Sequence, residues 1–248
     1  MIASYYNLAV EAVALSVSSE NYNFPKANLQ DTTRWTKYRT LYLTGQWIKM
    51  NAPASAASHL FIDNHNVTSD ATITLEANDT DSWTSPSFSE TVTWDAGMMM
   101  LFFTEETYNY WRLKIDYATN PDGYIEIGLL HLGPVVQFPG MEPAQSLPYS
   151  SESKKTISPS RQVYGDIRAS FREFEVAFKH VTNLQRLNIN TLYGYCQNVR
   201  PMFLLPWEDA LDFEPPMYCV IADKTLKWKR NNNPRYPWGV SIKFEEVF

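Results

Sequence analysis

The sequence is poor in the residues on which many catalytic and cofactor sites depend. Its 248 residues include nine glycines, two cysteines and four histidines. Loops that cradle phosphate groups need glycines at close spacing, and no GxGxxG or GxxxxGK[ST] pattern occurs in the chain. The nucleophile pattern GxSxG is also missing. Nucleotide cofactors and serine-hydrolase chemistry are therefore not expected.

Metal-ligating spacings are missing as well. The four histidines are far apart, with no HxH, HxxxH or Cys/His pairing, so neither a metal nor a cofactor is expected: His59, His65, His131 and His180. Cys196 and Cys219 fit no zinc or redox motif. Their plain interpretation is that of small buried hydrophobic residues, and a disulfide between them stays open.

Long apolar runs and a basic leader are likewise missing. No segment approaches the roughly 18 apolar residues of a membrane span. Glu11 interrupts the apolar stretch near the N-terminus, and no Lys or Arg precedes it, so a secretory signal is not expected. The formal net charge is −6, which speaks against binding nucleic acid over the whole surface.

Paired carboxylates for acid–base catalysis are not evident either. Adjacent acids occur at Glu105-Glu106 and at Glu245-Glu246. Neighbours in a strand point to opposite faces of a sheet, so neither pair can act on one substrate bond. With no catalytic residue to name, we expect a protein that is not an enzyme.

Short strands dominate what is present in residues 1–138. Aromatic residues make up 15% of the chain, which favours pleated, half-buried surfaces. In "YWRLKIDY", Trp111, Leu113 and Ile115 alternate with charged residues and predict the buried face of a strand. The turn signal Asn120-Pro-Asp-Gly123 follows, and it predicts a hairpin with the next strand. This region is expected to be a β-sandwich or jelly roll.

The second half has a different organisation. Residues 139–160 are rich in Pro and Ser and show no periodicity, which predicts a linker or an extended arm. Residues 161–248 return to alternating strands, with Phe174, Val176 and Phe178 on one face. One helix is expected, capped by Thr182 or Asn183, with a stripe of Leu184, Leu187 and Leu192 and a stop at Gly194.

Two groups of residues suggest surfaces with a binding role. A platform for stacking sugars is one interpretation of Trp83, Trp94, Trp111 and Tyr124, although aromatics in β-proteins more often serve cores and interfaces. The basic stretch from Lys224 to Arg235 surrounds Trp228. Salt bridges to a neighbouring subunit explain it better than contact with nucleic acid, because the chain as a whole is acidic.

The order of certain motifs resembles a known family. Asn28-Leu29 precede a polar turn and Trp35; His65-Asn66 follow a central strand; Trp111–Ile115 lead to "IEIGLLHLG" at 125–133. This order resembles the galactose-binding (discoidin)-like jelly-roll domain of bacteriophage minor tail proteins. The strands and helix of the second half are similar to the scaffold of distal tail and tail-tip proteins. Among such proteins the commonest domain order is the reverse.

The resemblance implies an all-β fold with one short helix. It implies a jelly-roll sandwich at 1–138, an arm at 139–160 and a ring-forming, tail-tube-like β-domain at 161–248. The implied function is that of a structural protein of the phage tail tip, found in the virion and assembled in the host cytoplasm. It would form a ring of copies of itself, with six favoured over three, and would join the tail tube to the hub and adhesion proteins.

Six basic residues of the second half, together with one tryptophan among them, are the expected subunit contacts, facing acidic surface on a neighbouring copy. They are Arg161, Arg168, Arg172, Lys227, Trp228, Lys229 and Arg230. The alternative function is a carbohydrate-binding module that recognises a saccharide of the host surface. In discoidin-like modules, loops at one end of the sandwich bind ligands or calcium, and the sequence does not say which applies here.

Overall fold

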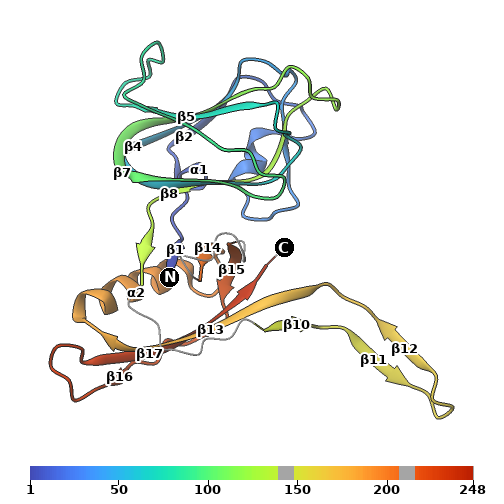
Figure 1. Cartoon of the computed structure of the whole chain (residues 1–248), viewed down its shortest axis with the longest axis vertical. Coiled ribbons are helices and arrows are strands. Elements are labelled where there is room, and N and C mark those ends of the chain that lie inside the picture. The colour runs from blue at the N-terminus through green and yellow to red at the C-terminus, as the bar shows by residue number, and fades with distance from the viewer. Residues whose placement is uncertain (139–147, 207–215, 248) are drawn as a thin grey trace. The chain divides into compact units, whose positions relative to one another are not determined.

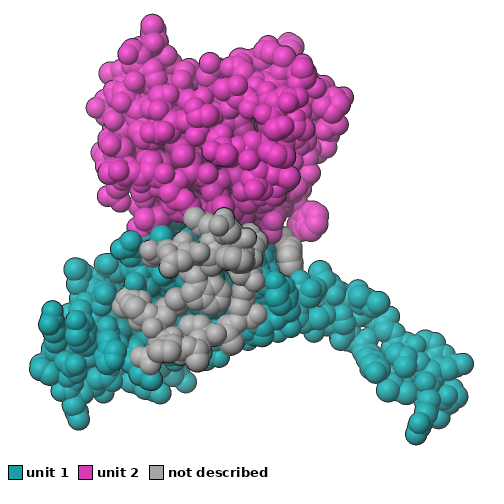
Figure 2. All heavy atoms as spheres, in the orientation of Figure 1, with its two compact units in different colours: residues 1–5, 136–247 teal, residues 6–135, 248 magenta. Residues whose placement is uncertain are grey.

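The computed structural model describes residues 1–138, 148–206 and 216–247 (Figure 1). The chain divides into two compact units, shown in separate colours in Figure 2. The sandwich unit comprises residues 6–135. The second unit comprises residues 1–5 together with the described residues from 136 to 247. Strands dominate both units, so the expected mainly-β fold class is confirmed.

The sandwich unit is built from one antiparallel sheet that doubles over on itself. The sheet order is β3-β8-β4-β7-β5-β6, with β2 added along β4. The strands are β2 (Ala14–Val17), β3 (Tyr38–Arg39), β4 (Gln46–His65), β5 (Thr72–Asn78), β6 (Phe88–Thr91), β7 (Met99–Asp116) and β8 (Glu126–Gly133). A short helix, α1 (Leu8–Glu11), and a 3-10 turn, η1 (Lys26–Gln30), complete the unit.

Two long strands, β4 and β7, take part in both layers of the sandwich, and Figure 1 shows them curving together. The first part of β4 pairs with the last part of β7, and the last part of β4 pairs with the first part of β7. The register shifts between Asn51 and Ser55. Ala54 adopts the left-handed conformation there, with φ of 49°. This corner turns one sheet into two facing layers.

The core lies between the two layers. Trp111, Leu113 and Ile115 of β7 are buried, as the alternation in the sequence predicts. They pack with Ile48 of β4 from the same layer and with Leu130 of β8 from the other, in one continuous apolar cluster. Burial of this size is the main source of stability for a domain of this length.

The hairpin predicted at 120–123 is wrong. The turn forms, with the Gly123 amide donating to the Asn120 carbonyl at 3.2 Å. The strands on its two sides do not pair with each other, because β4 lies between β7 and β8 in the sheet. A strong turn signal shows that the chain reverses, but it does not show which strand lies beside which.

The second unit is a sheet of order β10-β13-β17-β15-β14-β1-β9, with β16 added to β17. Its strands are β1 (Ile2–Ser4), β9 (Val136–Gln137), β10 (Tyr149–Ser151), β13 (Ser170–Val181), β14 (Met202–Leu205), β15 (Met217–Ile221), β16 (Lys229–Arg230) and β17 (Trp238–Glu246). Phe174, Val176 and Phe178 are buried on one face, which confirms the alternation expected there.

The unit boundaries differ from the expected ranges at both ends of the sandwich. Residues 1–5 and 136–138 lie in the second unit, because β1 pairs with β14 on one side and with β9 on the other. Part of the expected arm, residues 139–147, falls outside the described residues. The remainder of the arm is not irregular, since β10 pairs with β13, and β11 (Lys154–Ile157) pairs with β12 (Val163–Asp166). The described part of the arm thus contains a β-hairpin, β11–β12, that runs past residue 160.

The expected helix is α2 (Asn183–Cys196), and its start is as predicted. The Thr182 hydroxyl accepts from the Gln185 amide, and the Gln185 side chain accepts from the Thr182 amide, which completes a capping box. The predicted stripe is mostly wrong: Leu184 and Leu187 are exposed, and the buried side chains are Ile189, Leu192 and Cys196.

The helix end and the cysteines complete the second core. The helix continues through Gly194 and ends at Gln197, which is left-handed. Cys196 and Cys219 are both free, buried thiols in this core. Burial raises the pKa of Cys196 to about 12 and that of Cys219 well above its usual value. Both therefore stay protonated and unreactive at neutral pH.

A tight crossing at the end of β8 provides a test of the fold. A Cβ atom on Gly133 would lie 2.0 Å from the Tyr6 carbonyl oxygen, which is a backbone atom and cannot turn aside. We predict that Gly133→Ala lowers the free energy of unfolding of the sandwich unit by about 1–3 kcal/mol, as measured by urea denaturation. Gly194→Ala is the matched control, since its added Cβ meets nothing within 4 Å. Equal stability of the two variants would contradict the crossing.

Candidate functional site

The strand end Asp63–His65 forms the floor of a cleft in the sandwich unit. Asn64 adopts a left-handed conformation, with φ of 54°. Its amide N–H donates to Asp63 Oδ1 at 2.8 Å, which is the local bond that makes this conformation acceptable for Asn. The backbone of the strand therefore changes direction just before it ends. The side chains of Asp63, Asn64 and His65 all line the cleft there.

A turn containing Arg34 and Trp35 is fastened to this floor by two contacts. The Arg34 guanidinium lies 2.5 Å from Asp63 Oδ2, with the Asp63 side chain only 7% exposed. The Arg34 carbonyl accepts from Asn64 Nδ2 at 2.5 Å. An ion pair with a nearly buried carboxylate is screened less by water than one at the surface, so the turn is held firmly.

Gly128 of β8 makes this arrangement sterically acceptable. A Cβ atom at that position would lie 2.9 Å from Asn64 Cβ and Nδ2 and 3.0 Å from the Arg34 carbonyl oxygen. Both the floor and the turn thus rest directly on the β8 backbone. A glycine in the middle of a strand often marks such a close approach.

The loop at 94–97 lines the cleft beside His65, through Ala96 and Gly97. His65 Nδ1 accepts from the Val67 amide at 3.2 Å, which leaves the ring proton on Nε2. Burial lowers the pKa of His65, opposed by the Asp95 backbone and by the Asp63 carboxylate, so the ring is neutral at neutral pH. Trp94 Nε1 donates to the Val67 carbonyl at 2.9 Å and anchors the start of the loop.

Trp35 stands at the rim of the cleft with 74% of its surface exposed. The space enclosed is about 400 Å³. The residues that line this loop-end cleft are Arg34, Trp35, Asp63, Asn64, His65, Ala96 and Gly97. A cleft that combines an exposed indole with several fixed polar groups is the candidate ligand site of this unit.

The ion pair and the neutral imidazole give the cleft a balanced charge. Arg34 and Asp63 compensate each other, and His65 carries no charge. A guanidinium has five N–H donors, and Asn64 adds an amide with both donor and acceptor atoms. The cleft suits an uncharged ligand that has hydroxyl or amide groups and one apolar face.

A second polar cluster stiffens the neighbouring loops. Glu126 is only 6% exposed, and its carboxylate forms ion pairs with both Lys37 and Arg39. The Arg39 guanidinium also lies between two rings, 3.7 Å from the centroid of Phe24 and 4.5 Å from that of Tyr124. The loop that carries Trp35 is therefore followed by a rigid segment and not by a free one.

The aromatic platform considered from the sequence does not form. Trp111 is fully buried in the core, and Tyr124 packs on Arg39. Trp83 lies at the other end of the sandwich, where its ring covers Arg112 and its Nε1 donates to Asp81. None of the four lines the cleft, although Trp94 begins the loop whose Ala96 and Gly97 do.

Trp35 and His65 belong to the motifs that carry the family resemblance, and neither was predicted from the sequence as a ligand contact. The signal that could have found Trp35 is its setting in "DTTRWTK", where a large apolar residue stands alone in a polar turn. Such a residue has no neighbours with which to form a core, so exposure is the natural expectation.

The expected subunit-contact arginines fall into two environments. Arg161, with φ of 61°, and Arg168 are exposed near the hairpin of β11 and β12, and Arg168 contacts Glu152 and Asp166. Arg172 is different, because it is buried and pairs with Glu246. Its charge is neutralised inside its own chain, which speaks against a contact with a neighbouring copy, although that contact stays a prediction. The others also remain predictions.

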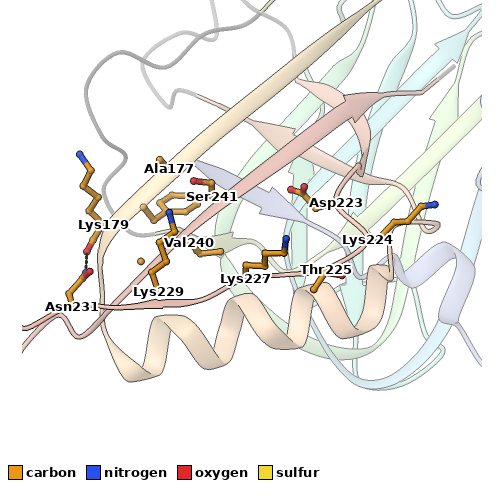
Figure 3. A pocket seen from close by; sticks show the side chains of 12 residues that line it. Ala177, Lys179, Asp223, Lys224, Thr225, Lys227, Lys229, Asn231, Val240 and Ser241 are labelled. Atoms are coloured by element: carbon orange, nitrogen blue, oxygen red, sulfur yellow. Dashed lines mark hydrogen bonds between the residues drawn. The ribbon is translucent and has the colours of Figure 1, made fainter.

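The expected basic cluster around Trp228 is partly brought together. Trp228 is half-buried and donates from Nε1 to Asn190 Oδ1 at 2.9 Å. Lys227 and Lys229 line a second cavity, shown in Figure 3. Arg230 lies in β16 opposite Trp238 and outside that cavity.

Within the residues that the structure describes, no group of three or more His, Cys, Asp or Glu could hold a metal ion. His59 and His131 lie with ring centroids 5.4 Å apart, and burial lowers the pKa of His59 to about 3. Over the same described residues, no helix is long and apolar enough to cross a membrane.

No protein-family model and no curated protein matches the chain. Several solved structures are similar over about half of it. Chitosan-binding module 1 of a chitosanase/glucanase from Paenibacillus sp. IK-5 is 18% identical, with a TM-score of 0.42, over 51% of this chain and 98% of that chain. A Streptococcus pneumoniae fucose binding module is 15% identical, with a TM-score of 0.42, over 52% and 95%. The lectin domain of Lectinolysin complexed with Lewis B antigen is 12% identical, with a TM-score of 0.43, over 52% and 96%.

The support that Gly128 gives to the cleft can be tested directly. We predict that Gly128→Ala displaces Asn64 and loosens the Arg34–Trp35 turn, at a cost of about 1–3 kcal/mol in the free energy of unfolding. The measurement is the indole N–H resonance of each tryptophan in a ¹⁵N-correlated spectrum. The Trp35 resonance should shift, while that of Trp83 at the other end of the sandwich should not. An unchanged Trp35 resonance would show that the turn does not rest on β8.

Proposed function

We propose that the sandwich unit is a carbohydrate-binding module that holds an uncharged saccharide in the loop-end cleft. The observation that carries the proposal is the exposed indole of Trp35 beside the fixed polar groups of Arg34, Asp63 and Asn64. Binding is the whole of the proposed activity, with no chemical step.

The chemistry of a sugar ring matches both parts of the cleft. One face of a pyranose presents C–H groups, which pack well on the flat face of an indole. Its edge presents hydroxyls, each of which donates and accepts hydrogen bonds. Arg34 and Asn64 offer donors, and the Asn64 amide oxygen offers an acceptor. A cleft of about 400 Å³ lies within the range of small-ligand sites, roughly 300–1,000 Å³.

Charge separates a neutral sugar from other ligands. An anionic ligand would gain little from Arg34, because Asp63 already lies 2.5 Å from its guanidinium. A cationic ligand would likewise gain little from Asp63, because Arg34 already compensates that carboxylate. Since both charges are compensated within the site, the ligand that fits best carries none.

The test is to substitute Trp35 and measure saccharide binding. A glycan array with the full chain identifies the ligand, and calorimetry then gives its affinity. Trp35→Ala should weaken binding at least tenfold, because an aromatic anchor at a rim commonly contributes about 1–3 kcal/mol. Trp83→Ala removes an indole at the opposite end of the sandwich and should leave the affinity unchanged.

Two results would reject the saccharide proposal. One is a broad array on which the unaltered chain binds no glycan above background. The other is a bound glycan whose affinity is the same in Trp35→Ala as in the unaltered chain, which would place the site elsewhere.

A second candidate function is supported by the exposed hairpin of β11 and β12. Every residue of both strands is exposed, including Ile157, Val163 and Tyr164. Ile167, just beyond β12, is 92% exposed. Figure 1 shows the two strands projecting as a ribbon beyond β10. A two-stranded ribbon of this kind is only marginally stable alone, so a surface that covers it would stabilise it.

We infer that this hairpin is a contact of a self-assembling structural protein, such as a ring subunit of a phage tail tip. Replacing Ile157, Val163 and Tyr164 together by Ser should convert an assembly of several copies into monomers, as measured by light scattering. The control is the triple replacement of Leu184, Leu187 and Val199, which are exposed outside the hairpin. A monomeric unaltered chain at high concentration, or assembly that survives the hairpin change, would reject this role.

A further inference from the structure

A second cavity lies in the second unit, where the edge of β17 is left uncovered. On one side of β17, the pairing with β15 stops at Ile221 and Phe244. The pairing with β16 on the same side starts at Lys229 and Gly239. The Ala222 amide still donates to the Lys243 carbonyl at 2.9 Å, and the chain from 224 to 228 then bulges away from the sheet. The bulge leaves a cavity of about 680 Å³ beside Val240 and Ser241.

The lysines of the bulge line this cavity because the apolar residues between them pack against the core. Leu226 and Trp228 pack against the second core, and Trp228 is fixed further by its bond to Asn190. In an extended chain, alternate residues point to opposite sides. Lys227 and Lys229 are therefore turned away from the core, and Figure 3 shows both extending toward β17.

Positive charge dominates the walls, and small residues form the floor. Lys179, Lys224, Lys227 and Lys229 line the cavity, against a single acid, Asp223. Asp223 Oδ2 accepts from the Lys243 amide at 2.8 Å and so is engaged with the sheet. The floor consists of Ala177, Gly239 and Ser241, which leave the sheet open to close approach.

We propose that this lysine pocket binds a small ligand carrying two or more negative charges on phosphate or sulfate groups. Lys227 and Lys229 extend toward the same space beside β17, so their like charges repel one another and an anion placed between them relieves that repulsion (Figure 3). Lys179 and Lys224 lie at opposite ends of the cavity and add to its positive potential. The arrangement is local, because the chain as a whole has a net charge of −6. Ser241 and Thr225 add hydroxyl donors beside the lysines.

The shape of the pocket favours a compact ligand over a polymer. Its volume lies within the range for small-ligand sites, and it is bounded on two sides by the sheet edge and the bulge. A duplex nucleic acid needs a broad basic surface, whereas here the positive charge is confined to one pocket of an acidic protein. An acidic polypeptide is the alternative that the experiment must separate.

The probe is inorganic pyrophosphate, titrated into the full chain and followed by calorimetry, with sulfate and citrate as parallel arms. We expect saturable pyrophosphate binding that weakens at least tenfold in Lys227→Gln/Lys229→Gln. The matched control is Lys154→Gln/Lys155→Gln, which removes two exposed lysines of β11 and should bind as the unaltered chain does. Sulfate binding would show that the pocket accepts both phosphate and sulfate groups. Citrate binding equal to that of pyrophosphate would show that the pocket selects only for negative charge, which overturns the preference for phosphate and sulfate.

A further variant guards against effects on folding. Ser241→Asp keeps every lysine and changes an exposed side chain, yet it places a negative charge on the floor and should also abolish pyrophosphate binding. The melting temperature of each variant confirms that it is folded. The proposal is overturned by an absence of saturable binding, by equal loss in the β11 control, or by binding of poly-glutamate without pyrophosphate.

Discussion

The pairing of β4 with β7 along nearly their whole length is the constraint on which the sandwich unit depends. The two strands bend together at Ala54, so each contributes one half to either layer. The remaining strands only extend these two halves, with β2 and β5 on one layer and β8 on the other. The cleft follows from this geometry, because Asp63–His65 is the place where β4 ends after its turn into the second layer.

The sequence predicted features set by residues that are close together along the chain, and failed for features set by contacts between distant segments. Local alternation correctly gave the buried faces of β7 and β13, and a local capping pattern gave the start of α2. Which strand lies beside which is set by contacts between distant segments, so the hairpin at 120–123 was predicted wrongly. The same holds for β1, whose partner β14 lies some two hundred residues along the chain.

The candidate site shows the same division. Nothing in the immediate surroundings of Asn64 indicates that Arg34 will lie on it, because that contact exists only where β8 carries a glycine at position 128. Helical periodicity failed for Leu184 and Leu187 for a related reason. One side of a helix becomes buried only by meeting a sheet, and the sheet meets the side that carries Ile189 and Leu192.

The position of β1 beside β9 has a consequence for the order in which the chain is made and folded. The polypeptide begins in the second unit, leaves it for residues 6–135, and returns at Val136, which pairs with Ala3. The sandwich is therefore an insertion whose two ends emerge side by side, an arrangement that lets a domain be exchanged without disturbing its host. During synthesis the sandwich can fold as soon as it is complete, whereas β1 meets β9 only after the sandwich has been translated and meets β14 later still.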